Sequence, residues 1–411
     1  MNAVELCVGA GGLALGAAKA GFRHLAVIED DHSACQTLRE NRRQGHPLVA
    51  GWPIHEVDVR DFDYRSILTS VDLLSAGVPC QPFSVAGKAR AHRDKRDLFA
   101  EVVRAARILR PKAILIENVR GLRRSKFKEY LEYILLALAS PELARDPKQS
   151  WRDHFKALIK QGAMPTVRKP LRYDVYIHLV NAADYGVPQC RERVFIVAFR
   201  SDLEIQWQLP KPTHSLLALA WDQWKTGNYW RRHRLQRRRP GRVSRRMASA
   251  IDSINESDLE SPLLPWNTIR DAQRGLPGAR RDAKARHPSN HVFNPGARSY
   301  KGHSGSLIDE PAKTLKAGSH GVPGGENSLI ISGRKIRYFS VRECARFQSF
   351  PDEYIFVGSW ASMMRQIGNA VPVRLAEVIT GAIRRHLELT AISRRTPKIA
   401  NIEVGQVRNA C

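Results

Sequence analysis

The sequence predicts an α/β fold, in which a mostly parallel, doubly wound sheet is joined to a smaller, irregular lobe. Short apolar runs alternate with helical patterns through residues 1–200, an order typical of a parallel sheet covered by helices on both faces. That pattern is lost between residues 215 and 330, where Gly, Pro, Asn and His interrupt the chain. A regular helical pattern returns at Ser340, which fits a capping box with Glu343.

Six strands are expected before residue 200, with helices between several of them, such as 98–109 and 127–138. The strands are 4–8, 25–28, 71–75, 113–116, 175–180 and 194–199. Residues 141–170 are expected to form an extra loop, and a last amphipathic helix is expected over 373–387. In open parallel sheets ligands bind beyond the carboxyl ends of the strands, so the residues that follow each strand are candidates for a site.

The composition narrows the class of protein. A hydrophobic content of 43% excludes wholesale disorder. The longest apolar run, near residues 134–139, is far short of the ~18 residues that span a bilayer, and no basic segment of a signal peptide is present at the N-terminus. The six cysteines form no CxxC pairs, which argues against a disulfide framework and a zinc site. We expect a cytoplasmic protein without a metal.

The charge predicts a polyanionic partner. Lys and Arg number 66 against 40 Asp and Glu, which gives a formal net charge of +26. A field of this size attracts nucleic acid, but it does not by itself distinguish DNA from RNA or from an anionic membrane.

A glycine-rich loop follows the first strand. Gly9, Gly11 and Gly12 let the backbone approach a ligand closely, and the helix that follows offers free N–H groups. Glu29 closes the second strand, about 20 residues further on, where a carboxylate can accept ribose hydroxyls. Asp58 stands at a third strand position, which is counted here in addition to the six apolar runs. Sites for NAD, FAD and S-adenosylmethionine (AdoMet) all use such loops, and a tight turn without a ligand has the same pattern.

Two reactive groups follow the next strands. The fourth strand ends in Pro79-Cys80-Gln81-Pro82. A cysteine held between prolines at this edge can act as a nucleophile if a cationic setting lowers its pKa, although most cysteines are small buried core residues. The fifth strand delivers Glu117, which follows an apolar run and can stay protonated as an acid; the alternative is a surface carboxylate.

Arginines supply the remaining candidates. Arg191 and Arg193, spaced by two on an extended segment, are expected to face the same way and to contact a phosphate or a base, although an ordinary strand start has the same spacing. Nine arginines fall within residues 231–246. That cluster is either a phosphate-contacting surface or a solvated loop.

Taken in order, these motifs resemble the DNA (cytosine-5) methyltransferase family. The order is the glycine-rich loop, Pro79-Cys80-Gln81, Glu117-Asn118-Val119, Gln189-x-Arg191-x-Arg193, the Arg-Glu-Cys-Ala-Arg segment that begins at 342, and Gly368-Asn369-Ala370-Val371-Pro372. The resemblance covers residues 1–212 and 328–387. It implies the class I fold of AdoMet-dependent methyltransferases, and the absence of a region before the first strand favours the prokaryotic or phage modification type.

The resemblance implies a mechanism and a division of the chain. Cys80 would attack C6 of a flipped cytosine, Glu117 would hold or protonate N3, and Arg193, aided by Arg191, would bind O2 and the nearby phosphate. Residues 1–214 would form the AdoMet-binding catalytic domain, completed by the C-terminal helices of 331–390. Residues 215–330 would be the target-recognition region, and 391–411 a disordered tail.

Residues are carried over where they match the family's positions. The cofactor positions are Cys7, Gly9, Gly11, Gly12, Glu29, Asp30, Asp58, Val59, Pro79, Leu98 and Asn369. The DNA-contact candidates are Gln81, Ser84, Arg231, Arg232, His233 and Arg234, with His291 and His303 as further groove candidates. The chain departs from the family at Cys7, which replaces an aromatic residue that would pack against the adenine.

The expected partner is duplex DNA, bound by a monomer that is associated with the nucleoid while it acts. A cognate restriction endonuclease acting on the same site is a further expected partner, and no membrane contact is expected. Two alternatives stay open, because a tRNA-methylating branch shares these motifs and a catalytically silent DNA-binding homologue would keep the fold.

Overall fold

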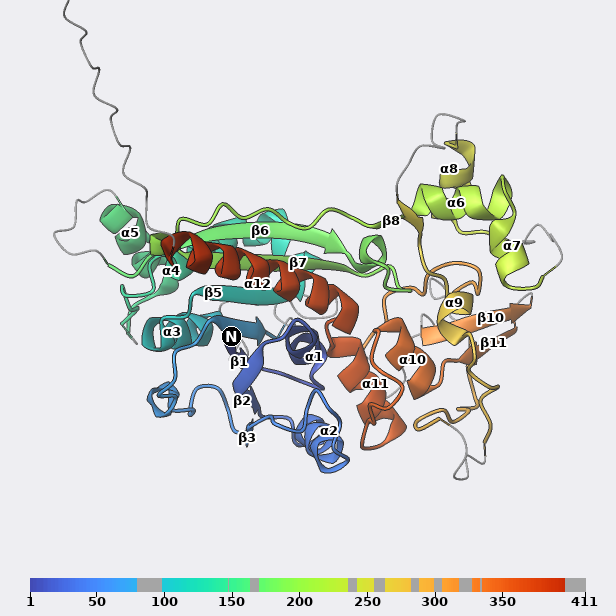
Figure 1. The fold of residues 1–411 in the computed structure, drawn as a ribbon, viewed down its shortest axis with the longest axis horizontal. Helices are drawn as coiled ribbons and strands as arrows, with labels where there is room; N and C mark the ends of the chain where they lie inside the picture. The colour runs from blue at the N-terminus through green and yellow to red at the C-terminus, as the bar shows by residue number, and fades with distance from the viewer. Residues whose placement is uncertain are drawn as a thin grey trace, which may run out of the picture.

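A seven-stranded sheet forms the centre of the computed structural model (Figure 1). The structure describes residues 1–79, 98–146, 148–162, 170–235, 242–254, 263–281, 288–298, 305–317, 327–332 and 335–395. The strands of the sheet are β1 (Asn2–Leu6), β2 (Arg23–Glu29), β3 (Ile54–Glu56), β4 (Leu73–Gly77), β5 (Ala113–Val119), β6 (Tyr173–Asn181) and β7 (Glu192–Arg200).

The strand order is β3-β2-β1-β4-β5-β7-β6. Neighbours from β3 to β5 pair in parallel, whereas β7 runs antiparallel to both β5 and β6. The prediction of a mostly parallel sheet is therefore confirmed, and all six expected strands are present within a few residues of their expected positions.

Helices cover both faces of the sheet, among them α1 (Gly12–Lys19), α2 (His32–Arg43), α3 (Phe99–Leu109), α4 (Lys128–Ala139) and α12 (Val373–Arg395). Further helices are α5 (Trp151–Gly162), which contacts α4, and α10 (Val341–Phe347) and α11 (Trp360–Asn369), which contact each other. Short 3-10 helices join them: η1 (Tyr64–Ser66), η3 (Arg120–Arg123), η4 (Ser125–Phe127), η5 (Ala182–Tyr185) and η6 (Ser201–Leu203). Among the described residues, no helix is both long and apolar enough to cross a membrane.

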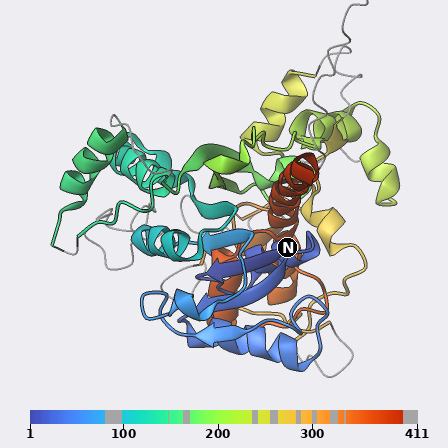
Figure 2. The same cartoon turned by 60° about the vertical axis from the view of Figure 1, so that its left-hand side comes forward.

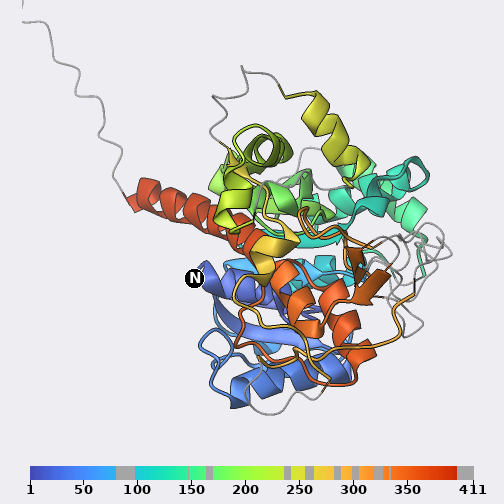
Figure 3. The same cartoon turned by 90° about the vertical axis from the view of Figure 1, so that its right-hand side faces the viewer.

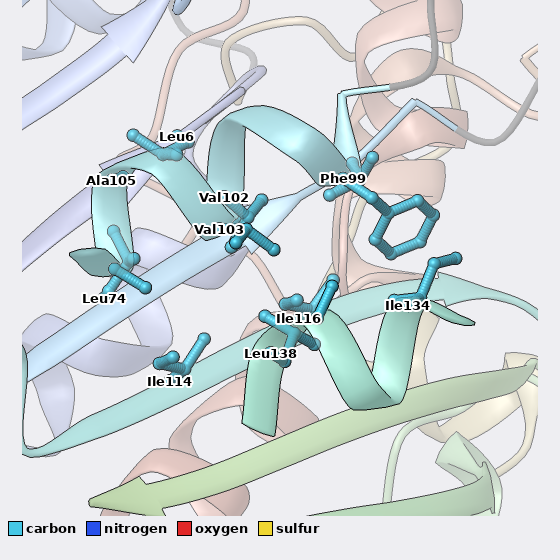
Figure 4. Close-up of a cluster of buried hydrophobic side chains, with 14 of the residues drawn as sticks. Leu6, Leu74, Phe99, Val102, Val103, Ala105, Ile114, Ile116, Ile134 and Leu138 are labelled. Atoms are coloured by element: carbon cyan, nitrogen blue, oxygen red, sulfur yellow. The ribbon is translucent and has the colours of Figure 1, made fainter. Parts of the chain in front are cut away.

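The apolar run of β5 is continuous because both faces of this strand are buried. Its side chains alternate between the faces, so Ile114 and Ile116 pack against α3 and α4 (Figure 4) while Leu115 packs in the cluster that contains α12. Because both faces are covered, neither set can be polar. This is the arrangement expected for a parallel strand in the middle of a doubly wound sheet.

The region 215–330 is irregular but contains its own hydrophobic cluster. Its elements are β8 (His214–Ser215), α6 (Leu216–Trp224), α7 (Asn228–Arg232), α8 (Arg245–Asp252), β9 (Leu264–Pro265), α9 (Ile269–Gln273) and, at its end, β10 (Ser328–Ser332), which pairs with β11 (Lys335–Tyr338). Tyr229, Trp230 and Met247 lie in the cluster. The helices α6 to α8 stand at one end of the molecule's long axis (Figure 1).

Two expectations about local structure are wrong. Residues 151–162 form the helix α5 rather than a loop, because Trp151, His154 and Leu158 recur at helical spacing and are buried. Trp151 packs against Tyr130 and Tyr133 of α4, with ring centroids 5.1 and 5.5 Å away. The helix α12 continues beyond residue 387 to Arg395, and residues 396–411 of the expected tail lie outside the described residues.

Helices α1 and α12 lie side by side, although they come from opposite ends of the chain (Figure 1). A Cβ at Gly12 would lie 2.2 Å from the backbone oxygen of Val371, and a Cβ at Gly16 would lie 2.3 Å from the Cβ of Ala376. Neither position has room for a side chain. This close approach brings the segment after α11 against the glycine-rich loop.

We expect Gly16→Ala to destabilise the protein. Alanine favours a helix by up to about 1 kcal/mol over glycine, but here its Cβ would also lie 2.6 Å from the backbone nitrogen of Glu377, so α12 must shift. Overpacking of this kind costs about 1–3 kcal/mol, which urea denaturation would measure. Gly51→Ala is the matched control, since nothing lies within 4 Å of its Cβ, and an equal effect of both changes would contradict the packing argument.

Candidate active site

The candidate residues gather at one edge of the sheet. Because β1 to β5 are parallel, the segments after β1, β2, β3 and β4 and the end of β5 meet there. The antiparallel strand β7 begins at the same edge, with Arg193 opposite Val119. The structure thus brings together Glu29, Asp58, Pro79 and Glu117, which are far apart in the sequence.

Glu117 and Arg193 form a buried ion pair at this edge. The Nε of Arg193 lies 2.9 Å from Oε1 of Glu117, and the two side chains are 11% and 9% exposed. The atoms are close without being aligned for a hydrogen bond, and Oε1 accepts no hydrogen bond from the residues that the structure describes. This oxygen is therefore an acceptor, or in its protonated form a donor, that a ligand can satisfy.

Burial raises the pKa of Glu117 above its usual value, and the positive charges of Arg193 and then Arg191 partly oppose that shift. The carboxyl consequently holds a proton to a higher pH than an exposed glutamate does, while the nearby guanidinium still stabilises the ionised form. A carboxyl balanced in this way can donate a proton to a ring nitrogen and take it back.

Asn118 connects this strand end to the neighbouring one. Its Nδ2 donates a hydrogen bond to the backbone oxygen of Val78 at 3.3 Å, and its Oδ1 accepts one from the backbone N–H of Val119 at 2.9 Å. The second bond orients the Asn118 side chain, and the first fixes the chain just before Pro79, which is half-buried. The candidates Cys80, Gln81 and Ser84 lie outside the described residues.

The structure corrects the expectation for Arg191. Its side chain is buried and donates hydrogen bonds to the backbone oxygens of Leu315 at 3.3 Å, Gly368 at 2.8 Å and Ala370 at 3.0 Å. A guanidinium enclosed by carbonyl groups is not placed to contact a phosphate. The prediction failed because β7 begins only at Glu192, so strand alternation does not govern Arg191.

Sequence reasoning missed the polar network to which Arg191 belongs. Gln189 and Gln348 are fully buried, and Nε2 of Gln189 donates to Oε1 of Gln348 at 3.2 Å. Gln348 in turn donates to the backbone oxygens of Ile367 and Ala370 at 2.7 and 3.0 Å. The network holds the end of α11, and with it Asn369, against the start of β7. In the sequence, only the two glutamines themselves could have indicated this network, and a glutamine alone does not predict a buried hydrogen bond.

The glycine-rich loop is tied to the second strand by Glu29. Gly9 N–H donates to Oε2 of Glu29 at 2.7 Å, and Asp31 N–H donates to Oε1 at 2.9 Å. Burial raises the pKa of Glu29 to about 7. A Cβ built at Gly9 meets nothing within 4 Å, whereas one at Gly11 would press on three side chains, so Gly9 is the glycine that borders open space.

Carboxylates surround Cys7 on the same side of the sheet. Burial and then the negative charges of Glu29, Asp30 and Asp58 raise the pKa of the Cys7 thiol. Asp58 is itself paired with Arg60, whose Nε lies 2.9 Å from Oδ1 and which lowers the pKa of that carboxyl.

The other cofactor candidates sit at the boundaries of elements. Leu98 precedes α3 as its N-cap residue, and Asn369 is exposed at the end of α11. Val59 is buried, and its backbone oxygen accepts a hydrogen bond from Tyr64 at 3.1 Å.

The basic cluster is divided between exposed and inward-facing side chains. Arg231 and Arg234 are exposed, and Arg232 is ion-paired with Asp222 at 2.8 Å. His233 is turned inward, 7% exposed, with its Nε2 2.9 Å from Asp271, so it is not placed to contact a groove.

The two further histidines predicted to contact a DNA groove are His291 and His303. His291 is buried, with Nδ1 2.7 Å from Ser340 Oγ and Nε2 2.6 Å from the backbone oxygen of Pro277. The prediction that it contacts DNA is therefore wrong, while His303 and residues 236–241 of the arginine cluster lie outside the described ranges. Both described histidines carry hydrogen bonds that organise the lobe, and a single sequence cannot distinguish such histidines from groove contacts.

Across the described parts of the chain, no group of three or more His, Cys, Asp or Glu side chains is arranged to hold a metal ion.

The family model for C-5 cytosine-specific DNA methylase matches residues 1–142 and 166–385. Type II methyltransferase M.NgoMIV of Neisseria gonorrhoeae is 31% identical over 94% of this chain and 98% of its own length. Type II methyltransferase M.PspPI of Psychrobacter sp. is 33% identical over 93% of this chain and 79% of its own length.

Solved structures agree on the fold. The Dnmt2 methyltransferase of S. pombe aligns with a TM-score of 0.53 and 16% identity, covering 95% of this chain and 98% of that chain. A DNA modification methyltransferase encoded in an E. coli prophage aligns with a TM-score of 0.52 and 20% identity, covering 94% and 99%. With the family model matching most of its length, the chain belongs to the C-5 cytosine-specific DNA methylase family and is a DNA (cytosine-5) methyltransferase.

Proposed function

We propose that the protein transfers a methyl group from AdoMet to C5 of a cytosine within a specific duplex DNA sequence, through base flipping and a covalent bond between Cys80 and C6. The observation that carries the proposal is the buried Glu117 carboxyl. It lies beside Arg193 with an oxygen that accepts no hydrogen bond from the described residues, on the strand next to the one that leads into Cys80.

The residues at the ends of β1 to β3 fit AdoMet. Gly9 borders open space, and the Glu29 carboxylate, held by two backbone N–H groups, can accept further hydrogen bonds from ribose hydroxyls. Asp58 would face the adenine amino group, and Cys7 would border the ring. AdoMet, when bound, would supply the methyl group and leave as S-adenosylhomocysteine.

Cys80 supplies the nucleophile in the proposed reaction. Its thiolate adds to C6 of the cytosine, forming a C–S bond and moving an electron pair toward C5, which becomes nucleophilic enough to accept a methyl group. A base then removes the C5 proton, the C–S bond breaks by elimination, and the thiolate is regenerated, while N3 returns its proton to Glu117. C6 cannot be reached inside a duplex, so the base must leave the stack, at a cost of a few kcal/mol.

Glu117 and Arg193 act on the other edge of the same base. The protonated Glu117 carboxyl donates to N3 as electrons move into the ring, which prevents negative charge from accumulating there. Arg193 binds O2 with its guanidinium, and its charge keeps the carboxylate formed by that donation stable. Arg191 supports this site from behind by holding the end of α11.

The domain division follows from the same assignment. Residues 1–214 and 331–390 form the catalytic domain, and 215–330 form the region that reads the DNA sequence, with Arg231 and Arg234 exposed for phosphate contacts. The protein acts as a monomer on duplex DNA. A restriction endonuclease that cuts the same site is the partner expected of a Type II modification enzyme.

A parallel assay on duplex DNA and tRNA with methyl-labelled AdoMet tests the substrate class. We expect label in duplex DNA and none above background in tRNA, because the long region between β7 and β10 offers a surface for reading a duplex sequence. Label confined to tRNA would support the RNA-methylating alternative. Label in neither, with DNA still bound, would support the catalytically silent homologue.

A further inference from the structure

A strongly basic arm extends from the end of β5. Residues 120–160, which we call the α4–α5 arm, contain ten Lys and Arg and five Asp and Glu. The first stretch, 120–128, has five of these cations and no acidic residue, and it begins three residues after Glu117. The positive charge of the arm thus starts beside the candidate active site and continues away from it.

The helix α5 is fixed in this arm by its apolar face. Trp151, His154 and Leu158 are buried, and His154 bonds through Nδ1 to Tyr133 at 3.1 Å and through Nε2 to the backbone oxygen of Leu143 at 3.0 Å. Arg152 lies 3.2 Å from Glu129 at the start of α4. The other face of α5 is therefore held outward in a defined orientation.

That outward face is a stripe of cations. Arg152, Lys156 and Lys160 recur every four residues on α5 and are exposed, with side-chain exposures of 56% for Arg152 and 80% for Lys156. Arg152 pairs with Glu129 in an ion pair whose two side chains are both more than half exposed, and Asp153 lies only at 4.0 Å from Lys156. Solvent screens both pairs, which leaves the charge of the stripe available to a partner.

Part of the arm lies outside the match to the family model. The family model matches residues 1–142 and resumes at 166, so α5 falls in the segment that the model does not match. The helix α5 therefore lies outside the part of the chain that the family model describes.

The position of the arm suits a long, straight ligand. Along the long axis, β5 lies between α5 at one end and α6 to α8 at the other (Figure 1). Figure 2 shows the arm, in teal and green, projecting from the body of the molecule, and in Figure 3 the arm and the orange hairpin of β10 and β11 both lie toward the right-hand side. A rod-shaped polyanion held near β10 can therefore continue along the arm.

We propose that the α4–α5 arm binds the phosphate backbone of duplex DNA beside the target site, through Arg152, Lys156 and Lys160. The inference rests on the proposed function. The chain from Arg120 to Glu129 spans at most about 35 Å, and Arg152 lies beside Glu129. Lys160 lies eight residues further along α5, about 12 Å, so these contacts fall within roughly fourteen base pairs of the flipped base. They contribute affinity and salt dependence without reading sequence.

The test compares two duplexes that carry a site methylated by the wild-type protein, one with about four and one with about twenty flanking base pairs on each side of it. The variant Arg152→Gln/Lys156→Gln/Lys160→Gln is expected to raise KM on the long duplex by about fivefold for each phosphate that the arm no longer binds at 0.15 M salt. On the short duplex kcat and KM should stay at wild-type values. The slope of log affinity against log salt should fall by about 0.9 per phosphate on the long duplex only.

Two further variants of the protein distinguish loss of DNA contacts from unfolding of α5 and from a general loss of positive charge. Lys156→Gln/Lys160→Gln retains the Arg152–Glu129 pair, so it is the variant to use if the triple change unfolds α5. The matched control, Arg23→Gln/Arg42→Gln/Arg43→Gln, removes three exposed charges from the β2–α2 edge and should leave both duplexes unaffected.

Unchanged KM on the long duplex, or an equal rise on both duplexes, would overturn the proposal and leave an acidic protein as the alternative partner of the arm. Failure of the wild-type protein to methylate either duplex would instead overturn the proposed function, and this inference with it.

Discussion

Replacing Cys80 with alanine is expected to lower the rate of methyl transfer by at least about 10⁴-fold, because removing a covalent nucleophile eliminates the step that activates C5. Binding of AdoMet and of duplex DNA should be retained, since neither depends on the thiol. The rate is measured as label transferred from AdoMet to duplex DNA, under single-turnover conditions.

Trapping separates this account from a structural role for Cys80. A duplex that carries 5-fluorocytosine at the target position cannot lose a proton from C5, so the wild-type enzyme should remain covalently attached and the Cys80→Ala variant should not. The control is Cys190→Ala, because burial raises the pKa of the Cys190 thiol to about 11, and that thiol is protonated at neutral pH. An adduct that survives in Cys80→Ala would remove Cys80 from its proposed role.

The second large effect is expected at Glu117. Glu117→Gln keeps the shape and one hydrogen-bond donor but cannot transfer a proton, so methyl transfer should fall by about 10²- to 10⁴-fold. The adjacent Glu192 provides a matched control. It is 41% exposed and pairs with Arg120 at 2.6 Å, and Glu192→Gln should keep near wild-type activity.

The pH profile gives Glu117 a signature that a structural role would not produce. Burial raises its pKa, so the proton it donates is present at low pH and is lost as the pH rises through that raised value. Activity of the wild-type enzyme should therefore fall on this alkaline limb, and the limb should be absent from Glu117→Gln. A variant profile that keeps the same limb would assign the titration to another group.

The sequence was a good guide wherever one regular element determines the position of a residue. The apolar run before Glu117 predicted β5, and parallel pairing then required Glu29, Pro79 and Glu117 to share an edge, which the structure confirms. The same logic failed at Arg191, because it lies just outside β7 and is held by carbonyls from the far end of the chain.

Long-range contacts account for the other differences. His291 is held by Ser340 and Pro277, and its role depends on partners that no local pattern identifies. The helix α5 was mistaken for a loop because the segment 141–170 is broken by Pro and Gly at its ends, although the spacing of Trp151, His154 and Leu158 is helical. The site residues themselves, above all Cys80, remain predictions that the mutants above test.

Bisulfite sequencing of DNA from cells that express the protein tests the central claim most directly, because it reports the product, its position and the surrounding sequence together. We predict that cytosines at one position within a single short sequence motif are protected from conversion in nearly every copy, and that expression of Cys80→Ala leaves them all convertible. The absence of any protected cytosine with the wild-type protein, or equal protection with Cys80→Ala, would contradict the account.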